Sequence, residues 1–303
     1  MSAVESIAEL NERFGILDLA TVVPGRGGLP KVLIASPQAH GEMYLHGSHV
    51  TSWIPKHAAE VIYCSSNTLW QDGHAIRGGV PICFPWFGDK ADDRKAPAHG
   101  FVRTKAWKLA SISQVEAGVA VTMTTANDDD TRKWWPHEFR LECCATFAAE
   151  LNIALTVTNT GSAAFSVEEA LHAYFHVGDA QQLAIRGLSG THYIDKVDHF
   201  TEKSQDGDVR LTGETDRVYL QTTHDLEIVD PALNRNITIR KQNSQNTVVW
   251  NPWAEKAAAM TDLGAGQWKK FVCVETANTG DAAVSVAPGE AYAMAVKVGF
   301  GGA

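Results

Sequence analysis

Long apolar runs are missing from this 303-residue sequence. No stretch reaches the roughly 18 apolar residues that a membrane-spanning helix needs. The first residues also lack the basic and apolar regions of an export signal, so we expect a cytoplasmic protein. No internal repeat, low-complexity tract or linker-like segment divides the chain. Because an all-β domain can use this length undivided, we expect one domain over residues 1–303.

Cysteine is also scarce, and its positions do not match the usual zinc sites. The five cysteines are an odd number without zinc-finger spacing, and the adjacent pair is poorly placed to form a disulfide. We therefore expect reduced thiols in the core, at Cys64, Cys83, Cys143, Cys144 and Cys273.

Excess positive charge is absent, since the formal net charge is −9 at pH 7. An acidic protein is not drawn electrostatically to nucleic acid or to anionic membrane surfaces, so we expect neither as a partner. An anionic ligand must instead meet a local basic site. The hydrophobic content of 45% is ordinary for a globular protein with a sizeable core.

Alternation of apolar and polar residues with a period of two is the dominant pattern of the sequence. Between residues 152 and 159, Ile153, Leu155 and Val157 alternate with smaller or polar residues, which is typical of a half-buried strand. Similar strands are expected at Arg140–Phe147, Phe165–Val177, Asn246–Trp250, Phe271–Glu275 and Ala291–Val298. A short amphipathic helix is expected before them, with its spaced residues at Val4, Ile7, Ala8, Asn11 and Phe14. Many strands and few helical stretches predict a large antiparallel β-sandwich.

Imidazoles stand on one face of the strand expected around residues 171–177. Alternation places the apolar odd-numbered residues on one face and His172, Tyr174 and His176 on the other. A face of this kind suits a sugar cleft, because rings cover C–H groups while polar atoms meet hydroxyls. A solvated sheet face is the alternative, and strand geometry alone does not choose.

A metal site is another interpretation of the same histidines. His46 and His49 would join His172 and His176 in an all-histidine centre resembling a zinc site. No acidic metal-binding motif accompanies them, and the cysteines have no matching spacing. We therefore expect no metal.

Three charged residues complete the set of candidates. Glu275 ends the apolar run at residues 271–275, and it is either a functional base or a strand-end charge in water. Arg77 and Arg103 lie in stretches punctuated by glycine, where guanidinium groups and closely approaching backbone suit an anion. Structural salt bridges are the alternative for both arginines. The glycine and lysine pattern of a phosphate-binding loop is absent.

Six motifs follow one another along most of the chain, at Ile76–Gly88, His99–Arg103, Leu171–Phe175, Glu214–Tyr219, Val249–Trp253 and Val272–Glu275. Together they resemble the hexose-6-phosphate 1-epimerases, a branch of the aldose 1-epimerase or galactose-mutarotase-like group. The run that ends in Phe-Pro-Trp-Phe-Gly is the most specific of them. Some members of that family have glutamine just before the His-Gly motif, where this sequence has Ala98.

The resemblance implies a β-sandwich of the galactose-mutarotase type with a sugar cleft on one sheet. It implies that His172 is the catalytic acid and Glu275 the catalytic base. The substrate-binding residues implied by position are Arg77 and Arg103 for the phosphate end, Asp216 for sugar hydroxyls, and His99. We expect a monomer that acts on a small-molecule sugar phosphate without a cofactor.

Anomer exchange requires a proton to leave the C1 hydroxyl while another reaches the ring oxygen, which opens the ring to an aldehyde. Ionised Glu275 and protonated His172 would do this, and their roles reverse on closure. Two other functions fit the same residues: an epimerase of unphosphorylated aldoses and a noncatalytic carbohydrate-binding protein. Convergence of Arg77 and Arg103 would favour a phosphorylated substrate. His172 and Glu275 on opposite sides of a sugar-sized gap would favour catalysis over binding alone.

Overall fold

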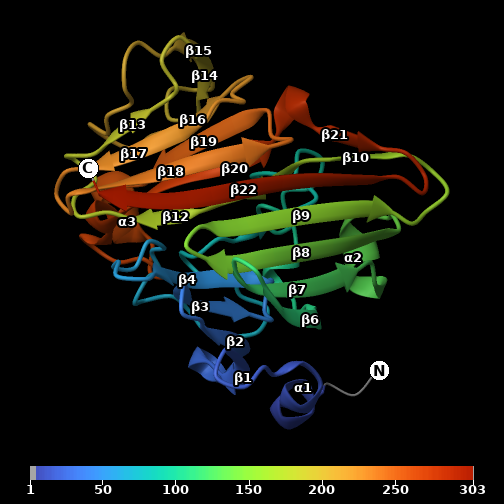
Figure 1. Cartoon of the computed structure of the whole chain (residues 1–303). Helices are drawn as coiled ribbons and strands as arrows, with labels where there is room; N and C mark the ends of the chain where they lie inside the picture. The colour runs from blue at the N-terminus through green and yellow to red at the C-terminus, as the bar shows by residue number, and fades with distance from the viewer. Residues whose placement is uncertain (1–4, 303) are drawn as a thin grey trace.

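The computed structural model describes residues 5–302, which form mainly antiparallel strands (Figure 1). One eight-stranded sheet has the order β13 (Ala184–Arg186), β17 (Leu226–Asp230), β18 (Arg235–Gln242), β22 (Ala291–Gly302), β9 (Leu151–Asn159), β8 (Phe139–Ala148), β7 (Gly118–Ala126) and β6 (Lys108–Val115). The other has the order β15 (Thr201–Ser204), β14 (His192–Asp195), β16 (Thr215–Tyr219), β19 (Asn246–Asn251), β20 (Phe271–Asn278), β11 (Glu169–Leu171) and β5 (Ile82–Cys83), and β12 (Tyr174–His176) also pairs with β20. We call the second one the β15–β5 sheet.

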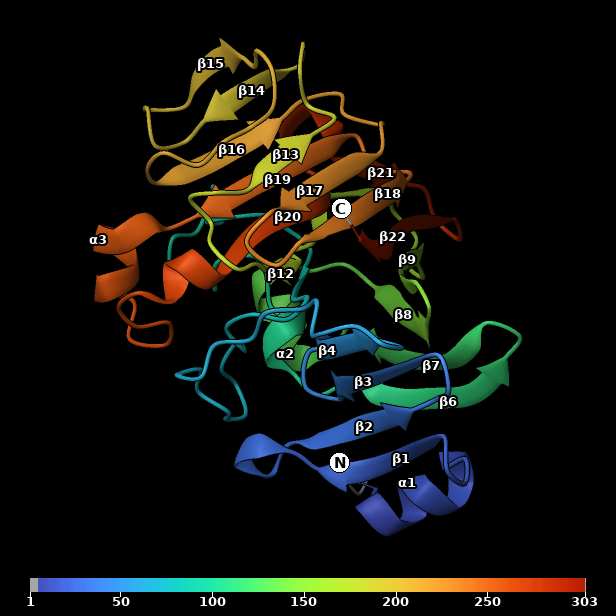
Figure 2. The same ribbon diagram turned by 60° about the vertical axis from the view of Figure 1, so that its left-hand side comes forward.

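Smaller elements surround these two sheets. A four-stranded sheet contains β1 (Ala20–Pro24), β2 (Pro30–Ala35), β3 (Ala39–Tyr44) and β4 (His49–Pro55), and a two-stranded sheet contains β10 (Phe165–Val167) and β21 (Val284–Val286). The helices are α1 (Ile7–Phe14), α2 (Asp129–Trp134) and α3 (Trp253–Ala259), with short 3-10 turns at Arg26–Gly28, Val102–Thr104, Gln267–Lys270 and Gly280–Ala282. In Figure 2, α1 and the four-stranded sheet lie at the end of the molecule away from β14 and β15. None of the described helices is long and apolar enough to cross a membrane.

The main core lies between the two large sheets because each strand alternates its side chains. Val272 and Val274 of β20 enter one buried apolar cluster together with Leu155 of β9 and Met294 of β22. The alternate residues of β20, Cys273 and Glu275, face the other way. One face of the β15–β5 sheet therefore packs in the core, and its opposite face can carry a functional site.

The sequence predicted the first helix and five of the strands correctly. Helix α1 begins after Ser6, whose hydroxyl accepts from the Glu9 backbone while the Glu9 carboxylate accepts from the Ser6 backbone, a capping box. Val4, the first residue of that prediction, lies outside the described residues. The confirmed strands lie within β8, β9, β19, β20 and β22.

The single strand expected over Phe165–Val177 is wrong, because the structure divides it into β10, β11 and β12. The break between β11 and β12 falls where the backbone N–H of His172 donates to the carbonyl of Pro81, outside the ladder. The alternation of side chains nevertheless continues across this break, since Leu171, Ala173 and Phe175 all enter the main core.

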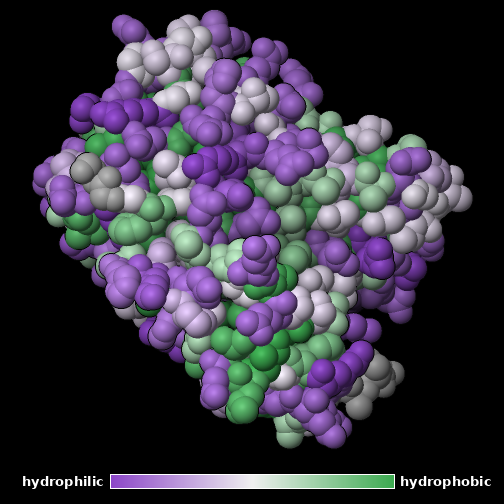
Figure 3. All heavy atoms as spheres, viewed as in Figure 1, coloured by the Kyte–Doolittle hydropathy of each residue, from purple (hydrophilic) through white to green (hydrophobic). Residues whose placement is uncertain are grey.

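Apolar side chains also gather on the surface near the four-stranded sheet. Figure 3 shows a green area in the lower part of this face, where Figure 1 draws β1 to β3. Leu17, just before β1, is 88% exposed, and Leu33 of β2 is 37% exposed. The rest of this face is mainly hydrophilic, so the apolar area is local.

Two glycines with the same left-handed φ of 73° allow a matched test of the loop that carries His99 and Arg103. A Cβ at Gly100 would lie 1.8 Å from the carbonyl oxygen of Phe84, whereas one at Gly88 would meet nothing within 4 Å. We expect Gly88→Ala to lower the free energy of unfolding by about 1–2 kcal/mol through backbone strain. Gly100→Ala should cost a further ~1–3 kcal/mol through the clash. Urea unfolding measures both, and equal losses would contradict the close approach.

Candidate active site

The pairing of β12 with β20 brings two ionisable side chains together. Tyr174 lies opposite Cys273 in this register, so His172, two residues earlier, falls opposite Glu275. Residues that face each other across a sheet are close neighbours. His172 Nδ1 accordingly lies 3.4 Å from Glu275 Oε1.

The sugar-sized gap that we considered between these two residues is therefore absent. The reason is the register, which sets the two residues side by side on neighbouring strands with 3.4 Å between their nearest polar atoms.

Both members of the pair are buried, and their polar atoms are left without partners. Glu275 is 1% exposed and His172 is 7% exposed, which excludes a solvated sheet face for these two side chains. Neither carboxylate oxygen of Glu275 nor Nδ1 of His172 has a hydrogen-bond partner among the described residues. A buried polar atom left unpaired costs about 1–3 kcal/mol. Such atoms on one face indicate a site that a ligand completes.

Burial shifts the two pKa values in opposite directions. Desolvation raises the pKa of Glu275 well above its usual value, and the Asp216 carboxylate adds to the rise. Desolvation lowers the pKa of His172 well below its usual value, and His99 and Arg103 add to the fall. Both shifts favour the neutral forms, a protonated carboxyl beside a neutral imidazole.

His99 is a third ionisable side chain beside the pair. Its ring centre is 5.6 Å from that of His172, and its Nδ1 accepts a hydrogen bond from the backbone N–H of Gly88 at 3.3 Å. Burial lowers the pKa of His99 well below its usual value, so the ring is neutral. Because Nδ1 accepts, the ring proton lies on Nε2, which makes His99 a hydrogen-bond donor.

Arg77 approaches the pair from the segment before β5. Its Nε and Nη2 lie 3.0 and 2.9 Å from Oδ2 of Asp262, and its Nη1 donates to the Tyr174 hydroxyl at 3.1 Å. Arg77 therefore makes a structural salt bridge, which the sequence analysis gave as the alternative to an anion site. Sequence reasoning missed Asp262, because no motif includes it.

Arg103 lies in the short turn at residues 102–104 and is held less completely. Its Nη2 donates to the carbonyl of Ala98 at 2.8 Å, while its buried Nε has no partner among the described residues. The positive charges of Arg103 and Arg77 both contribute to the lowered pKa of His172. The two guanidinium groups therefore act on one centre.

Asp216 and Lys196 lie on the other side of the pair, toward β14. Asp216 is opposite Trp250 of β19, and the Lys196 backbone donates to the Asp216 carbonyl. Lys196 Nζ lies 3.8 Å from Asp216 Oδ1 and 4.7 Å from the centre of the Phe87 ring. Sequence reasoning missed Lys196, which is an isolated lysine in a polar hairpin.

Aromatic rings form the surface around the imidazole. The Tyr174 ring stacks on His172 at 5.0 Å between centres with an interplanar angle of 10°, and the Trp250 ring meets His172 edge-on at 6.1 Å. Such faces cover the C–H groups of a sugar while the polar atoms meet its hydroxyls.

The remaining histidines of the metal alternative lie in different surroundings. His46 Nε2 contacts the carbonyl of His74 at 2.7 Å, and His49 Nε2 contacts the carbonyl of Gly78 at 2.8 Å. His176 lies against Arg235. In residues 5–302 no group of three or more His, Cys, Asp or Glu side chains is arranged to hold a metal ion.

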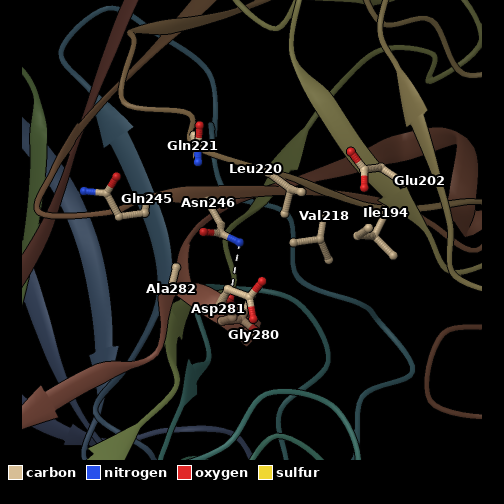
Figure 4. Close-up of a pocket in the computed structure, with 11 residues that line it drawn as sticks. Ile194, Glu202, Val218, Leu220, Gln221, Gln245, Asn246, Gly280, Asp281 and Ala282 are labelled. Atoms are coloured by element: carbon tan, nitrogen blue, oxygen red, sulfur yellow. Dashed lines mark hydrogen bonds between the residues drawn. The ribbon is translucent and has the colours of Figure 1, made fainter.

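A pocket of about 550 Å³ lies farther along the same sheet (Figure 4). Its wall includes Ile194 of β14 and Val218 of β16, which follow the same alternation as Lys196 and Asp216. The pocket is therefore adjacent to the Lys196 and Asp216 end of the site. His172 and Glu275 are not part of its lining.

The fold and the buried pair have the character of a carbohydrate epimerase, and comparison with known proteins agrees. The family described as aldose 1-epimerase matches residues 30–298, a span that includes every candidate residue above. The chain belongs to the aldose 1-epimerase family.

Individual relatives extend this result. A protein from Escherichia coli (strain K12) named "Putative glucose-6-phosphate 1-epimerase" is 40% identical over 250 residues, which cover 82% of this chain and 83% of that protein. A Cenchrus ciliaris protein of the same name is 32% identical over 286 residues, covering 90% and 85%. The crystal structure of a Salmonella typhimurium protein described as a "putative mutarotase" superposes with a TM-score of 0.89 at 32% identity, covering 96% of each chain. The predicted family resemblance and β-sandwich fold are confirmed.

The raised pKa of Glu275 predicts how its replacement changes stability with pH. In the unfolded chain this carboxyl ionises around its ordinary value of 4.5, while in the folded protein it stays protonated to higher pH. The folded state therefore binds more protons, and the contribution of Glu275 to stability falls as pH rises above 4.5. We expect Glu275→Gln, which does not ionise, to gain stability relative to the wild type as pH is raised.

Urea unfolding of both proteins at several pH values measures this difference. Glu150→Gln, at an exposed glutamate paired with Arg240 and Lys297, is the control for loss of a carboxylate. A difference between wild type and Glu275→Gln that stayed constant with pH would contradict the raised pKa.

Proposed function

We propose that this chain interconverts the α and β anomers of a hexose 6-phosphate, with glucose 6-phosphate as the expected substrate. The observation that carries the proposal is the buried 3.4 Å contact between His172 Nδ1 and Glu275 Oε1, whose polar atoms have no partner among the described residues. Membership of the aldose 1-epimerase family and the names of the relatives support the reaction class.

In the proposed mechanism Glu275 takes the proton of the C1 hydroxyl while His172 delivers a proton to the ring oxygen. The C1–O5 bond breaks, the aldehyde forms, and rotation about C1–C2 followed by reclosure gives the other anomer. No metal or redox cofactor takes part, because each step is a proton transfer between the sugar and a side chain.

The proton count of the pair is unchanged by ring opening. Before the step, His172 is an imidazolium and Glu275 a carboxylate; after it, His172 is neutral and Glu275 is protonated. Desolvation favours the neutral state. Burial therefore promotes the opening half-reaction without any exchange of protons with solvent. The substrate phosphate, as a nearby anion, favours the imidazolium needed to begin the cycle.

Arg77 and Arg103 are proposed to hold the phosphate. The buried Nε of half-buried Arg103 is an unpartnered donor, and Arg77 lies close enough to act on the same imidazole. Guanidinium groups bind phosphate oxygens in a planar, paired geometry that an ammonium group cannot reproduce. His99 and Asp216 are proposed to contact the sugar itself.

We also propose that the whole chain acts as one domain in the cytoplasm, as a monomer. One buried cluster takes side chains from the four-stranded sheet and from both large sheets, which supports a single domain. All five cysteines are free thiols, which suits a reducing compartment.

Anomer-exchange NMR on glucose 6-phosphate, with and without the enzyme, tests the proposed function. We expect exchange faster than the spontaneous rate. Exchange at the spontaneous rate for each of several hexose phosphates would contradict the proposal. Faster exchange for glucose than for glucose 6-phosphate would instead favour the alternative epimerase of unphosphorylated aldoses.

Replacing either member of the buried pair tests the proposed acid and base. We expect His172→Asn and Glu275→Gln each to lower kcat by about 10²–10⁴, the usual effect of losing a positioned acid or base. Both variants should keep the fold, because each substitute has a similar shape. A near-normal rate of anomer exchange by either folded variant would show that the replaced residue is not the acid or the base.

Replacing the two arginines tests the phosphate site. Each charged hydrogen bond contributes roughly 1.5–3 kcal/mol, so Arg77→Ala with Arg103→Ala should lower kcat/KM for glucose 6-phosphate by about 10²–10⁴. The loss should be small for glucose, which carries no anion. Arg240→Ala, at an exposed arginine paired with Glu150, is the control. Equal losses for both sugars would show that the arginines organise the cleft rather than bind phosphate.

A further inference from the structure

Lys196 and Asp216 form a charged pair that leaves most of its hydrogen-bonding capacity unused. Both side chains are only 23% exposed. Within residues 5–302, Lys196 Nζ makes no hydrogen bond, and neither does the Asp216 carboxylate. The ammonium group has three donors and the carboxylate has several acceptor positions. Two half-buried charges with open donors and acceptors, on the same sheet face as the unpartnered Glu275 carboxylate, are placed to meet a polar ligand.

The distance between the two groups fits a hydroxyl. At 3.8 Å, Nζ and Oδ1 are too far apart for a direct hydrogen bond. An oxygen atom about 2.8 Å from both would accept a hydrogen bond from Lys196 and donate one to Asp216. A hydroxyl group does both at once, whereas a phosphate oxygen would only accept and would be repelled by Asp216.

The position of the pair fits a single sugar. Asp216 lies two strands from β20 in the β15–β5 sheet, a span of about 10 Å between backbones. Its side chain shares the face of Trp250 and Glu275, since Trp250 is opposite both Asp216 and Cys273. The charges of Lys196 and Asp216 both act on Glu275. The arginines therefore lie near His172, and the Lys196–Asp216 pair lies on the other side of Glu275.

We propose that Lys196 is a substrate-binding residue that, with Asp216, holds one ring hydroxyl of the hexose at a carbon other than C1. This inference rests on the proposed function and adds a determinant of specificity to it. Phe87 fixes the ammonium group by lying beneath it at 4.7 Å. A site built to bind a hydroxyl rejects the deoxy analogue, because its buried polar groups are then left unpaired.

The test compares substrates as well as variants. We would measure kcat/KM for anomer exchange of glucose 6-phosphate and its 2-, 3- and 4-deoxy analogues with the wild type and Lys196→Met. On glucose 6-phosphate we expect a loss of about 10–100-fold, the size of one hydrogen bond to a charged group. For one of the deoxy analogues the wild type and the variant should be nearly equal, since that analogue lacks the hydroxyl that Lys196 binds.

Lys256→Met is the matched control. Lys256 also acts on Asp216, but its Nζ donates to Glu214 at 2.7 Å and is thereby engaged. Removing this charge should leave kcat/KM within about threefold, well below the roughly tenfold effect of a lost hydrogen bond to a charged group. An equal effect of both lysine variants would overturn the proposal, because charge alone would then explain it.

Three further results would overturn it. An equal loss on all four substrates would mean that Lys196 binds no single hydroxyl, and a shifted pH profile in addition would mean that it acts through Glu275. A loss for glucose 6-phosphate but not for glucose would assign Lys196 to the phosphate. No loss on any substrate would remove it from the site.

A binding measurement separates this inference from the proposed reaction. The phosphate of 1,5-anhydroglucitol has the ring hydroxyls but no C1 hydroxyl, so it cannot change anomer. Calorimetry should show weaker binding to Lys196→Met than to the wild type and to Lys196→Gln, which keeps an N–H donor. If Lys196→Met does not fold, Lys196→Gln is compared with the wild type on the deoxy analogues in its place. Wild type that binds this compound but exchanges no anomers would contradict the proposed function alone, whereas unchanged binding by Lys196→Met would contradict the inference.

Discussion

The register between β12 and β20 is the constraint on which the candidate site depends. It places His172 opposite Glu275, and alternation turns both away from the main core. A slip of one residue would turn Glu275 into the core and Val274 toward the site, because side chains alternate with a period of two. Val272 and Val274 of the same strand are fully buried between the sheets and so hold this register in place. The packing of the core thus determines the geometry of the site.

Charges of both signs surround Glu275 and act on its pKa in opposite directions. Asp216 raises the pKa of Glu275 further than desolvation alone, while Lys196 and Arg103 lower it. The same two cations lower the pKa of the neutral His99 imidazole, after the larger effect of desolvation. An acidic protein therefore concentrates several of its basic groups at one site, where they would attract the anionic substrate that we propose.

Much of the fold could be predicted from alternation alone, because long strands such as β9 bury every second residue. The division of Phe165–Val177 could not, since it depends on a hydrogen bond from His172 to the loop at Pro81. Among site residues, the motifs named His172, Glu275, His99, Asp216 and both arginines. Sequence reasoning missed Lys196 and Asp262 because their roles depend on contacts with distant segments. Lys196 contacts Phe87 and Asp262 contacts Arg77, and no local sequence pattern indicates these contacts.

Two thiols, those of Cys83 and Cys273, lie on the Glu275 face, where the aldehyde of the proposed reaction would form. Desolvation raises the pKa of Cys83 and of Cys273, so both remain as neutral thiols. A thiolate would attack an open-chain sugar and form a hemithioacetal, whereas a buried neutral thiol is a poor nucleophile. The same burial that shifts the pKa values of His172 and Glu275 would thus keep both cysteines unreactive toward an open-chain aldehyde.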